Sequence, residues 1–122
     1  MSINEREALE FLKSAFTASV SGDAPDLTAR QSAILMVVAL ERGPHTVRGL
    51  AAELELSKPV ITRAVDKLES LGLVRRQTDE RDLRSVFIVR TQAGTTFLRA
   101  MARPIVKGAT TGKKPAKVSK AA

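Results

Sequence analysis

The chain of 122 residues has no cysteine, which excludes disulfide bonds, thiolate metal sites and a thiol redox switch. Its hydrophobic fraction of 43% is ordinary for a globular domain, and its net charge of +7 favours a polyanionic partner. The longest apolar run, Ala33–Leu40, is far shorter than the roughly 20 residues that cross a bilayer. We therefore expect a cytoplasmic protein without a membrane segment, a metal ion or a cofactor, in which the lone His45 is a loop or capping residue.

Two helices are predicted in the N-terminal third of the chain. Residues 4–20 carry apolar side chains at three- and four-residue spacings, which is typical of an amphipathic helix. Thr28 and Gln31 have the spacing of a capping box and predict a second helix over residues 28–40. The segment Ile34–Leu40 is apolar nearly all round, so this helix should run through the middle of the fold, and Gly43 is expected to close it as a left-handed cap.

Two short helices joined by a tight turn are predicted next. Thr46 is expected to cap a helix that runs to about Glu55. Ser57 followed by Pro59 is a strong signal for the start of another helix, which Gly72 should close. The second of these helices has a single apolar face, made of Ile61, Ala64, Val65, Leu68 and Leu71.

A β-hairpin and a last helix complete the predicted domain. Residues 73–77 and 84–90 predict two strands on either side of a charged turn. Thr91 should cap a final helix that ends near Met101. The order of elements predicts a mostly α-helical winged helix-turn-helix domain over residues 1–102, with the small hairpin as its wing.

The charge of the chain is unevenly distributed. Residues 1–56 have a net charge of −3, and residues 57–90 a net charge of +3, with eight basic and five acidic side chains. Residues 103–122 have six basic side chains and no acidic one, in a Gly-, Thr-, Lys-, Ala- and Pro-rich context that predicts a disordered tail. This tail either aids solubility or binds phosphates non-specifically, and we favour the second role. A specific phosphate-binding surface is expected within residues 57–90.

The side of the 57–71 helix opposite its apolar face is suited to reading a major groove. Arg63 can make a bidentate contact to guanine, and Thr62 and Pro59 can touch a thymine methyl group or a base edge. Lys58 and Lys67 can hold phosphates, which fixes register without reading sequence. The alternative is that these basic residues are only the solvated face of an amphipathic helix.

Arginines and aspartates gather around the predicted hairpin turn. The arginines, which suit a narrow minor groove, are Arg75, Arg76, Arg81 and Arg84. Asp79 and Asp82 are expected to support the wing, with Asp82 paired to Arg84 or Arg81. The alternative is a surface hairpin that is held by salt bridges and has no partner.

These motifs, in this order and spacing, resemble the MarR family of bacterial transcriptional regulators. The resemblance covers about residues 27–101. It rests on Leu27-Thr28-x-x-Gln31, Leu50-Ala51, Leu56-Ser57-Lys58-Pro59-x-x-Thr62-Arg63-x-x-Asp66-x-Leu68, Gly72-Leu73-Val74-Arg75-Arg76, Asp79-x-Arg81-Asp82-x-Arg84-Ser85 and Thr91-x-Ala93-Gly94. It implies that Ser57, Pro59, Thr62 and Arg63 sit in the major groove. It also implies that Arg81 enters the minor groove while Asp82 and Arg84 hold the wing.

The resemblance also implies a homodimer and leaves a small-molecule effector open. Members of the family pair through helices at both chain ends, so the helix at residues 4–20 is expected to serve dimerisation. The chain departs from the family pattern at Pro104 and the Gly/Lys-rich residues after it, which should interrupt a long C-terminal helix. It departs again at Arg90, where the family has an apolar residue. The lack of cysteine excludes the peroxide-sensing branch of the family.

The sequence therefore predicts a transcriptional regulator that binds specific sites in double-stranded DNA. Repression is the default expectation, because a bound dimer occludes promoter DNA. One alternative is a winged-helix module that docks another protein, and another is an architectural, nucleoid-associated DNA binder without a ligand response. An enzyme is disfavoured, since the sequence has no Gly-rich phosphate loop, no nucleophile–histidine arrangement and no carboxylate pair on an apolar face.

Overall fold

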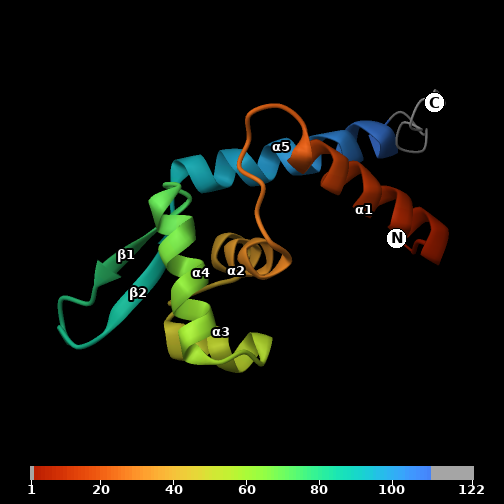
Figure 1. Ribbon diagram of the computed structural model, residues 1–122. Helices are drawn as coiled ribbons and strands as arrows, with labels where there is room; N and C mark the ends of the chain where they lie inside the picture. Colours follow the sequence, from red (N-terminus) through yellow and green to blue (C-terminus); the bar gives the residue numbers. More distant parts are fainter. Residues whose placement is uncertain (1, 111–122) are drawn as a thin grey trace. The chain divides into compact units, whose positions relative to one another are not determined.

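The computed structural model describes residues 2–110, which divide into two compact units. One unit contains the chain up to Asp26 together with the chain from Leu98 onward, and the other is Leu27–Phe97. The elements, drawn in Figure 1, are α1 (Glu5–Val20), α2 (Ala29–Leu40), α3 (Val47–Leu54), α4 (Lys58–Ser70), β1 (Val74–Thr78), β2 (Val86–Arg90) and α5 (Gln92–Thr110). Within residues 2–110, no helix combines the length and the apolar composition that spanning a bilayer requires.

Side-chain caps begin the first four helices, and the sequence predicts those of α2, α3 and α4. At α2, the Thr28 hydroxyl accepts from the Gln31 backbone N–H at 3.1 Å, and the Gln31 side chain accepts from the Thr28 N–H at 2.9 Å. Asn4 makes the same reciprocal capping box with Glu7 at α1. Thr46 and Ser57 cap α3 and α4, each by accepting from a backbone N–H three residues on. These bonds satisfy donors that the first turn of a helix leaves free.

The predicted role of Gly43 is wrong. Helix α2 already ends at Leu40, and its cap residue Glu41 is extended rather than left-handed. Gly43 is not among the residues with positive φ, whereas Gly72, after α4, has a φ of 75°. The prediction failed because a Gly-Pro pair marks a break in a helix without specifying which residue caps it. Gly43 instead accommodates the close approach of His45.

The core of the 27–97 unit lies where α2 packs against α4 and β2. Helix α4 also contacts α3 and β1, so every other element of the unit touches α2 or α4. Eight side chains are less than 2% exposed, and each contributes roughly 1.5–3 kcal/mol by burial. They are Ile34, Leu35, Leu50, Ile61, Val65, Leu68, Val74 and Ile88. All of them are aliphatic, as expected for a chain without tryptophan or tyrosine.

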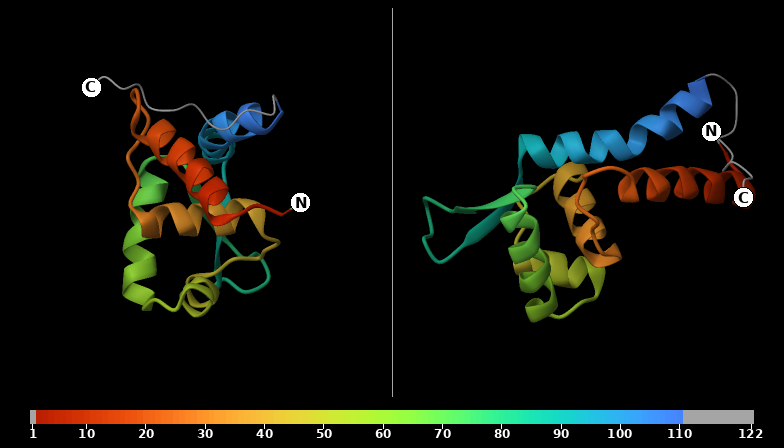
Figure 2. Two further views of the ribbon diagram at one scale, coloured as in Figure 1. Left: turned by 90° about the vertical axis from the view of Figure 1, so that its right-hand side faces the viewer. Right: turned by 45° about the horizontal axis from the view of Figure 1, so that its top comes forward.

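The two strands form an antiparallel hairpin with Arg76 opposite Ile88. They begin one and two residues later than predicted, at Val74 and Val86. Figure 1 and the right-hand view of Figure 2 show the turn of the hairpin extending past α3 and α4. The base of the hairpin is anchored, because the Ile88 N–H donates to the His45 carbonyl oxygen at 2.8 Å.

Helix α5 is longer than predicted. The expected end near Met101 and the expected disorder from residue 103 are wrong for residues 103–110, which are helical. Pro104 lies inside the helix. A proline removes one backbone hydrogen bond, at a cost of about 3 kcal/mol, yet the surrounding Ala, Met and Arg residues favour the helix. The rest of the predicted tail, residues 111–122, lies outside the described residues.

Candidate nucleic-acid interface

The start of α4 is exposed and held in place by its own sequence. Ser57 precedes the helix, and its hydroxyl accepts from the Val60 N–H at 3.3 Å. Pro59 lies in the first turn, where it sacrifices no hydrogen bond because that turn has no intrahelical acceptor for its amide. Ser57, Lys58 and Pro59 are all exposed. The first turn of α4 is therefore open to a ligand.

One face of α4 is buried and the other is free. Ile61, Ala64, Val65 and Leu68 are buried against the core, as predicted. On the remaining surface, Thr62 is half-buried, whereas Arg63 and Lys67 are exposed. The six residues that the sequence assigned to a major groove are thus brought together on one accessible surface, and we call Ser57, Lys58, Pro59, Thr62, Arg63 and Lys67 the reading face.

Two aspartates organise the tip of the hairpin. The Asp79 carboxylate accepts from the Arg81 backbone N–H at 2.9 Å. The Asp82 carboxylate accepts from the Arg84 backbone N–H at 3.0 Å and from its guanidinium at 3.1 Å, so the pairing of Asp82 with Arg84 is the one of the two predicted pairings that is present. These hydrogen bonds from Arg84, the backbone one first, lower the pKa of Asp82. The tip is therefore a braced turn.

The exposed arginines of the hairpin differ in what holds them. Arg75, Arg81 and Arg84 are exposed, but Arg84 is paired to Asp82. Among the described residues, Arg75 and Arg81 have no ion-pair partner. Both are therefore available to an external anion.

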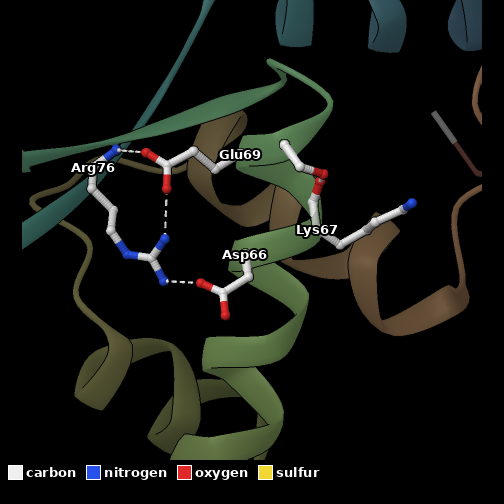
Figure 3. A network of polar contacts seen from close by, with 5 residues as sticks. Asp66, Lys67, Glu69 and Arg76 are labelled. Carbon is white, nitrogen blue, oxygen red and sulfur yellow. Dashed lines mark hydrogen bonds and ion pairs between the residues drawn. The ribbon is translucent and has the colours of Figure 1, made fainter.

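Arg76 is held differently from the other hairpin arginines, by a network with α4 (Figure 3). Its guanidinium donates to the Glu69 carboxylate at 2.6 Å and to the Asp66 carboxylate at 2.7 Å, and its backbone N–H donates to Glu69 at 3.1 Å. The hydrogen bonds from Arg76 lower the pKa of Glu69. Figure 3 also shows the Lys67 side chain extending away from this network. Because Arg76 already has two anionic partners, it is suited to bracing the hairpin against α4 rather than to binding a phosphate.

Sequence reasoning missed the carboxylate half of this brace. Asp66 is exposed on α4, and the sequence pattern suggests no role for Glu69. A signal existed, since residues three apart on a helix share a face. A strand that immediately follows the helix can bring a basic side chain opposite such a pair. The sequence does not reveal, however, which of the two consecutive arginines, Arg75 or Arg76, turns toward the helix.

His45 behaves as a structural residue. Its Nε2 lies 2.9 Å from the Glu41 carbonyl oxygen, and its own carbonyl oxygen accepts from the Ile88 N–H. In the described part of the chain, no group of three or more His, Cys, Asp or Glu side chains is placed to hold a metal ion.

The helix-turn-helix of α3 and α4, followed by a braced hairpin, defines a winged helix-turn-helix protein. A family model for the MarR family matches residues 26–85, which include α2, α3, α4 and β1. This match identifies residues 26–85 as a MarR-family segment.

Two curated relatives and one solved structure show further similarities. The chain is 32% identical over 84 residues to the transcriptional regulator HosA of Escherichia coli O157:H7, and the aligned segment spans 69% of this chain and 62% of HosA. It is 37% identical over 65 residues to the uncharacterized HTH-type transcriptional regulator YcgE of Bacillus subtilis, and this alignment spans 53% of this chain and 42% of YcgE. The match thus covers less than two thirds of the length of either relative. The fold is similar to that of S. aureus MepR in a MepR–DNA complex, with a TM-score of 0.63, 21% identity and coverage of 88% of this chain and 80% of MepR.

Proposed function

We propose that this protein is a transcriptional regulator, not an enzyme, and that it binds specific sequences of double-stranded DNA in the bacterial cytoplasm. The observation that carries the proposal is the reading face of α4, which is accessible, has three cationic side chains and lies beside a braced hairpin. The MarR-family match of residues 26–85, and the naming of HosA and YcgE as transcriptional regulators, support it.

In this proposal, the two parts of the interface have separate tasks. Arg63 reads guanine in the major groove, with Thr62 and Pro59 against neighbouring base edges. Arg81, at the tip of the hairpin, enters the minor groove. Lys58 and Lys67 hold phosphates and fix the register of α4. Arg76 contributes indirectly, because it sets the position of the hairpin relative to α4.

The protein acts as a two-fold dimer on a pseudo-palindromic site, and it represses by occluding the promoter. Helix α1 supports dimerisation, since Leu9, Leu12, Phe16 and Val20 recur along one face and are each more than half exposed in the single chain. A stripe of four large apolar side chains on one helix is a candidate interface rather than scattered surface apolarity.

The proposal is tested by gel shifts with genomic fragments in excess competitor DNA. Arg63→Ala should weaken binding to the preferred fragment by about 1–3 kcal/mol and relax sequence preference, because a base contact is lost. Lys67→Ala should weaken all sequences alike, because only a phosphate contact is lost. The matched control is Lys13→Ala on α1, which should leave binding unchanged.

Salt dependence separates DNA binding from the alternative of a protein-docking module. A DNA-binding protein releases counterions, so its affinity should fall steeply between low and moderate salt. The proposal would be wrong if the protein bound DNA only weakly and neither salt nor Arg63→Ala changed the affinity.

A further inference from the structure

A second basic feature of the 27–97 unit lies beside the reading face, and it is not apparent from the sequence pattern. A hollow of about 180 Å³ separates the first turn of α2 from the first half of α4. Its walls are Thr28, Arg30, Gln31, Val60, Arg63 and Ala64. Two of the six are arginines that come from different helices, and none is acidic.

Both arginines are available for a ligand. Arg30 and Arg63 are exposed, and within residues 2–110 neither guanidinium has an ion-pair partner. Arg76 is the contrasting case, since two carboxylates neutralise its charge. The positive charge of Arg30 and Arg63 is therefore not compensated within the described structure.

The neutral polar residues of the hollow also offer donors. The Thr28 hydroxyl oxygen and the Gln31 side-chain oxygen are occupied as acceptors by the reciprocal capping bonds. The hydroxyl hydrogen of Thr28 and the amide NH₂ of Gln31 remain to donate. A wall that combines two guanidiniums with two fixed neutral donors suits an anion with several acceptor oxygens, such as a phosphate group.

We propose that this hollow binds a backbone phosphate of the DNA strand that borders the groove entered by α4, with Arg30 as its principal contact. The inference rests on the proposed function, and it adds a binding residue on α2 to an interface so far confined to α4 and the hairpin. DNA is the favoured source of the phosphate because Arg63 belongs both to the reading face and to the hollow. When Arg63 reaches a base, Arg30, Gln31 and Thr28 remain to hold the phosphate.

Gln31→Glu is the sharpest test, because it changes the charge of the hollow while keeping the cap of α2. Glutamate at this position makes the same capping box as glutamine, and a negative charge in a first turn favours the helix. The variant should therefore unfold at the same temperature as the wild type or a higher one. Its affinity for DNA of any sequence should nevertheless fall by about tenfold, because a carboxylate replaces a phosphate donor.

Arg30→Ala tests the cation itself. The affinity of the wild type for DNA should fall between roughly 50 and 200 mM salt. Loss of one phosphate contact in Arg30→Ala should make this fall about threefold smaller. In ethylation interference, ethylation of one phosphate per half-site should inhibit binding of the wild type but not of Arg30→Ala. The sequence preference should stay unchanged. Arg30→Lys should recover much of the affinity, and the control Arg42→Ala, an exposed arginine just beyond the other end of α2, should behave as the wild type.

The outcomes separate this inference from the proposed function. If the wild type binds DNA in a salt-dependent way while Gln31→Glu and Arg30→Ala match it in affinity and salt slope, the hollow has no DNA role and the inference is wrong. The inference is also overturned if inorganic phosphate shifts the amide NMR signals of residues 28–31 while both variants bind DNA normally, since the hollow would then serve a free anion. Loss of DNA binding in the wild type itself would instead refute the proposed function.

Discussion

Arg76 and Arg75 are neighbours of the same type with different environments. Side chains alternate across a strand, so Arg75 is exposed while Arg76 turns to the Glu69 and Asp66 carboxylates of α4. An arginine with two carboxylate partners fixes the direction of the hairpin, whereas Arg81 has no ion-pair partner within residues 2–110 and is the arginine that we propose to contact DNA. The ion-pair partners of an arginine therefore distinguish one that positions the hairpin from one that is available to an external anion.

Arg76→Met should return the pKa of Glu69 toward its ordinary value of 4.5, because the hydrogen bonds that lower it are removed. A folded-state pKa below the unfolded value stabilises the fold above the unfolded pKa, and this contribution disappears as the pH falls through the folded pKa. The stability difference between wild type and variant should therefore shrink as the pH is lowered below about 4.5.

Carboxyl-detected NMR titration of Glu69 and denaturant unfolding across this pH range provide the measurements. Arg75→Met is the control, and it should leave the titration of Glu69 unchanged. An unaltered Glu69 titration in Arg76→Met would show that the brace is absent in solution. In DNA binding, Arg76→Met should weaken the hairpin contacts although it removes no direct contact to DNA.

At the scale of elements, the junction between the hairpin and α5 depends on two residues, Thr91 and Gly94. Thr91 ties the start of α5 to the end of α4, since its hydroxyl donates to the Gly72 carbonyl oxygen at 2.7 Å and accepts from the Gly94 N–H at 3.0 Å. Gly94 is buried against the Leu73 backbone, and a Cβ at this position would collide with the Leu73 carbonyl oxygen. The backbone cannot yield as a flexible side chain would.

Gly94→Ala should therefore destabilise the protein by about 1–3 kcal/mol, despite the higher helix propensity of alanine. Urea unfolding measures the effect. Gln92→Ala, an exposed change in the same turn, is the control and should stay within about 0.5 kcal/mol of the wild type. Equal stability of Gly94→Ala and the control would mean that Gly94 and the Leu73 backbone are further apart than described.

Element starts were predictable because each cap is a local signal. Thr28, Thr46, Ser57 and Thr91 each bond a backbone N–H three residues away, and the sequence alone identified all four. Element ends were less predictable. Gly43 and Pro104 are both breakers by type, but α2 stops before the first and α5 continues through the second. The difference depends on whether the free energy that the neighbouring residues gain by being helical exceeds the free energy lost with one hydrogen bond.

At the scale of the whole molecule, α1 has a row of exposed apolar side chains. Leu9, Leu12, Phe16 and Val20 are between 52% and 64% exposed, whereas the eight most buried aliphatic side chains all lie in the 27–97 unit. Exposure on this scale is costly in water, and a second copy of the chain would cover it. A dimer would also present two reading faces to one pseudo-palindromic site.

In the proposed dimer, Phe16→Glu should separate the two copies into monomers and lower DNA affinity by roughly 100-fold, because the two half-sites would no longer be bound together. Sedimentation velocity at matched concentrations reports the first effect, and gel shifts report the second. Thr17→Glu, which adds the same charge at the adjacent exposed position, should remain dimeric. A dimeric Phe16→Glu would show that α1 is not the interface.

The sequence by itself determined the order of the helices and strands, the caps, the apolar face of α4 and the identity of the cations around it, because these depend on contacts between residues close along the chain. Only the tertiary structure decided which of those cations are free. Arg76 meets Asp66 and Glu69 where β1 packs beside α4, and Arg30 joins Arg63 at the hollow where α2, distant in sequence, packs against α4. Charge type is local, but charge compensation depends on packing, and it is compensation that separates a brace from a binding site.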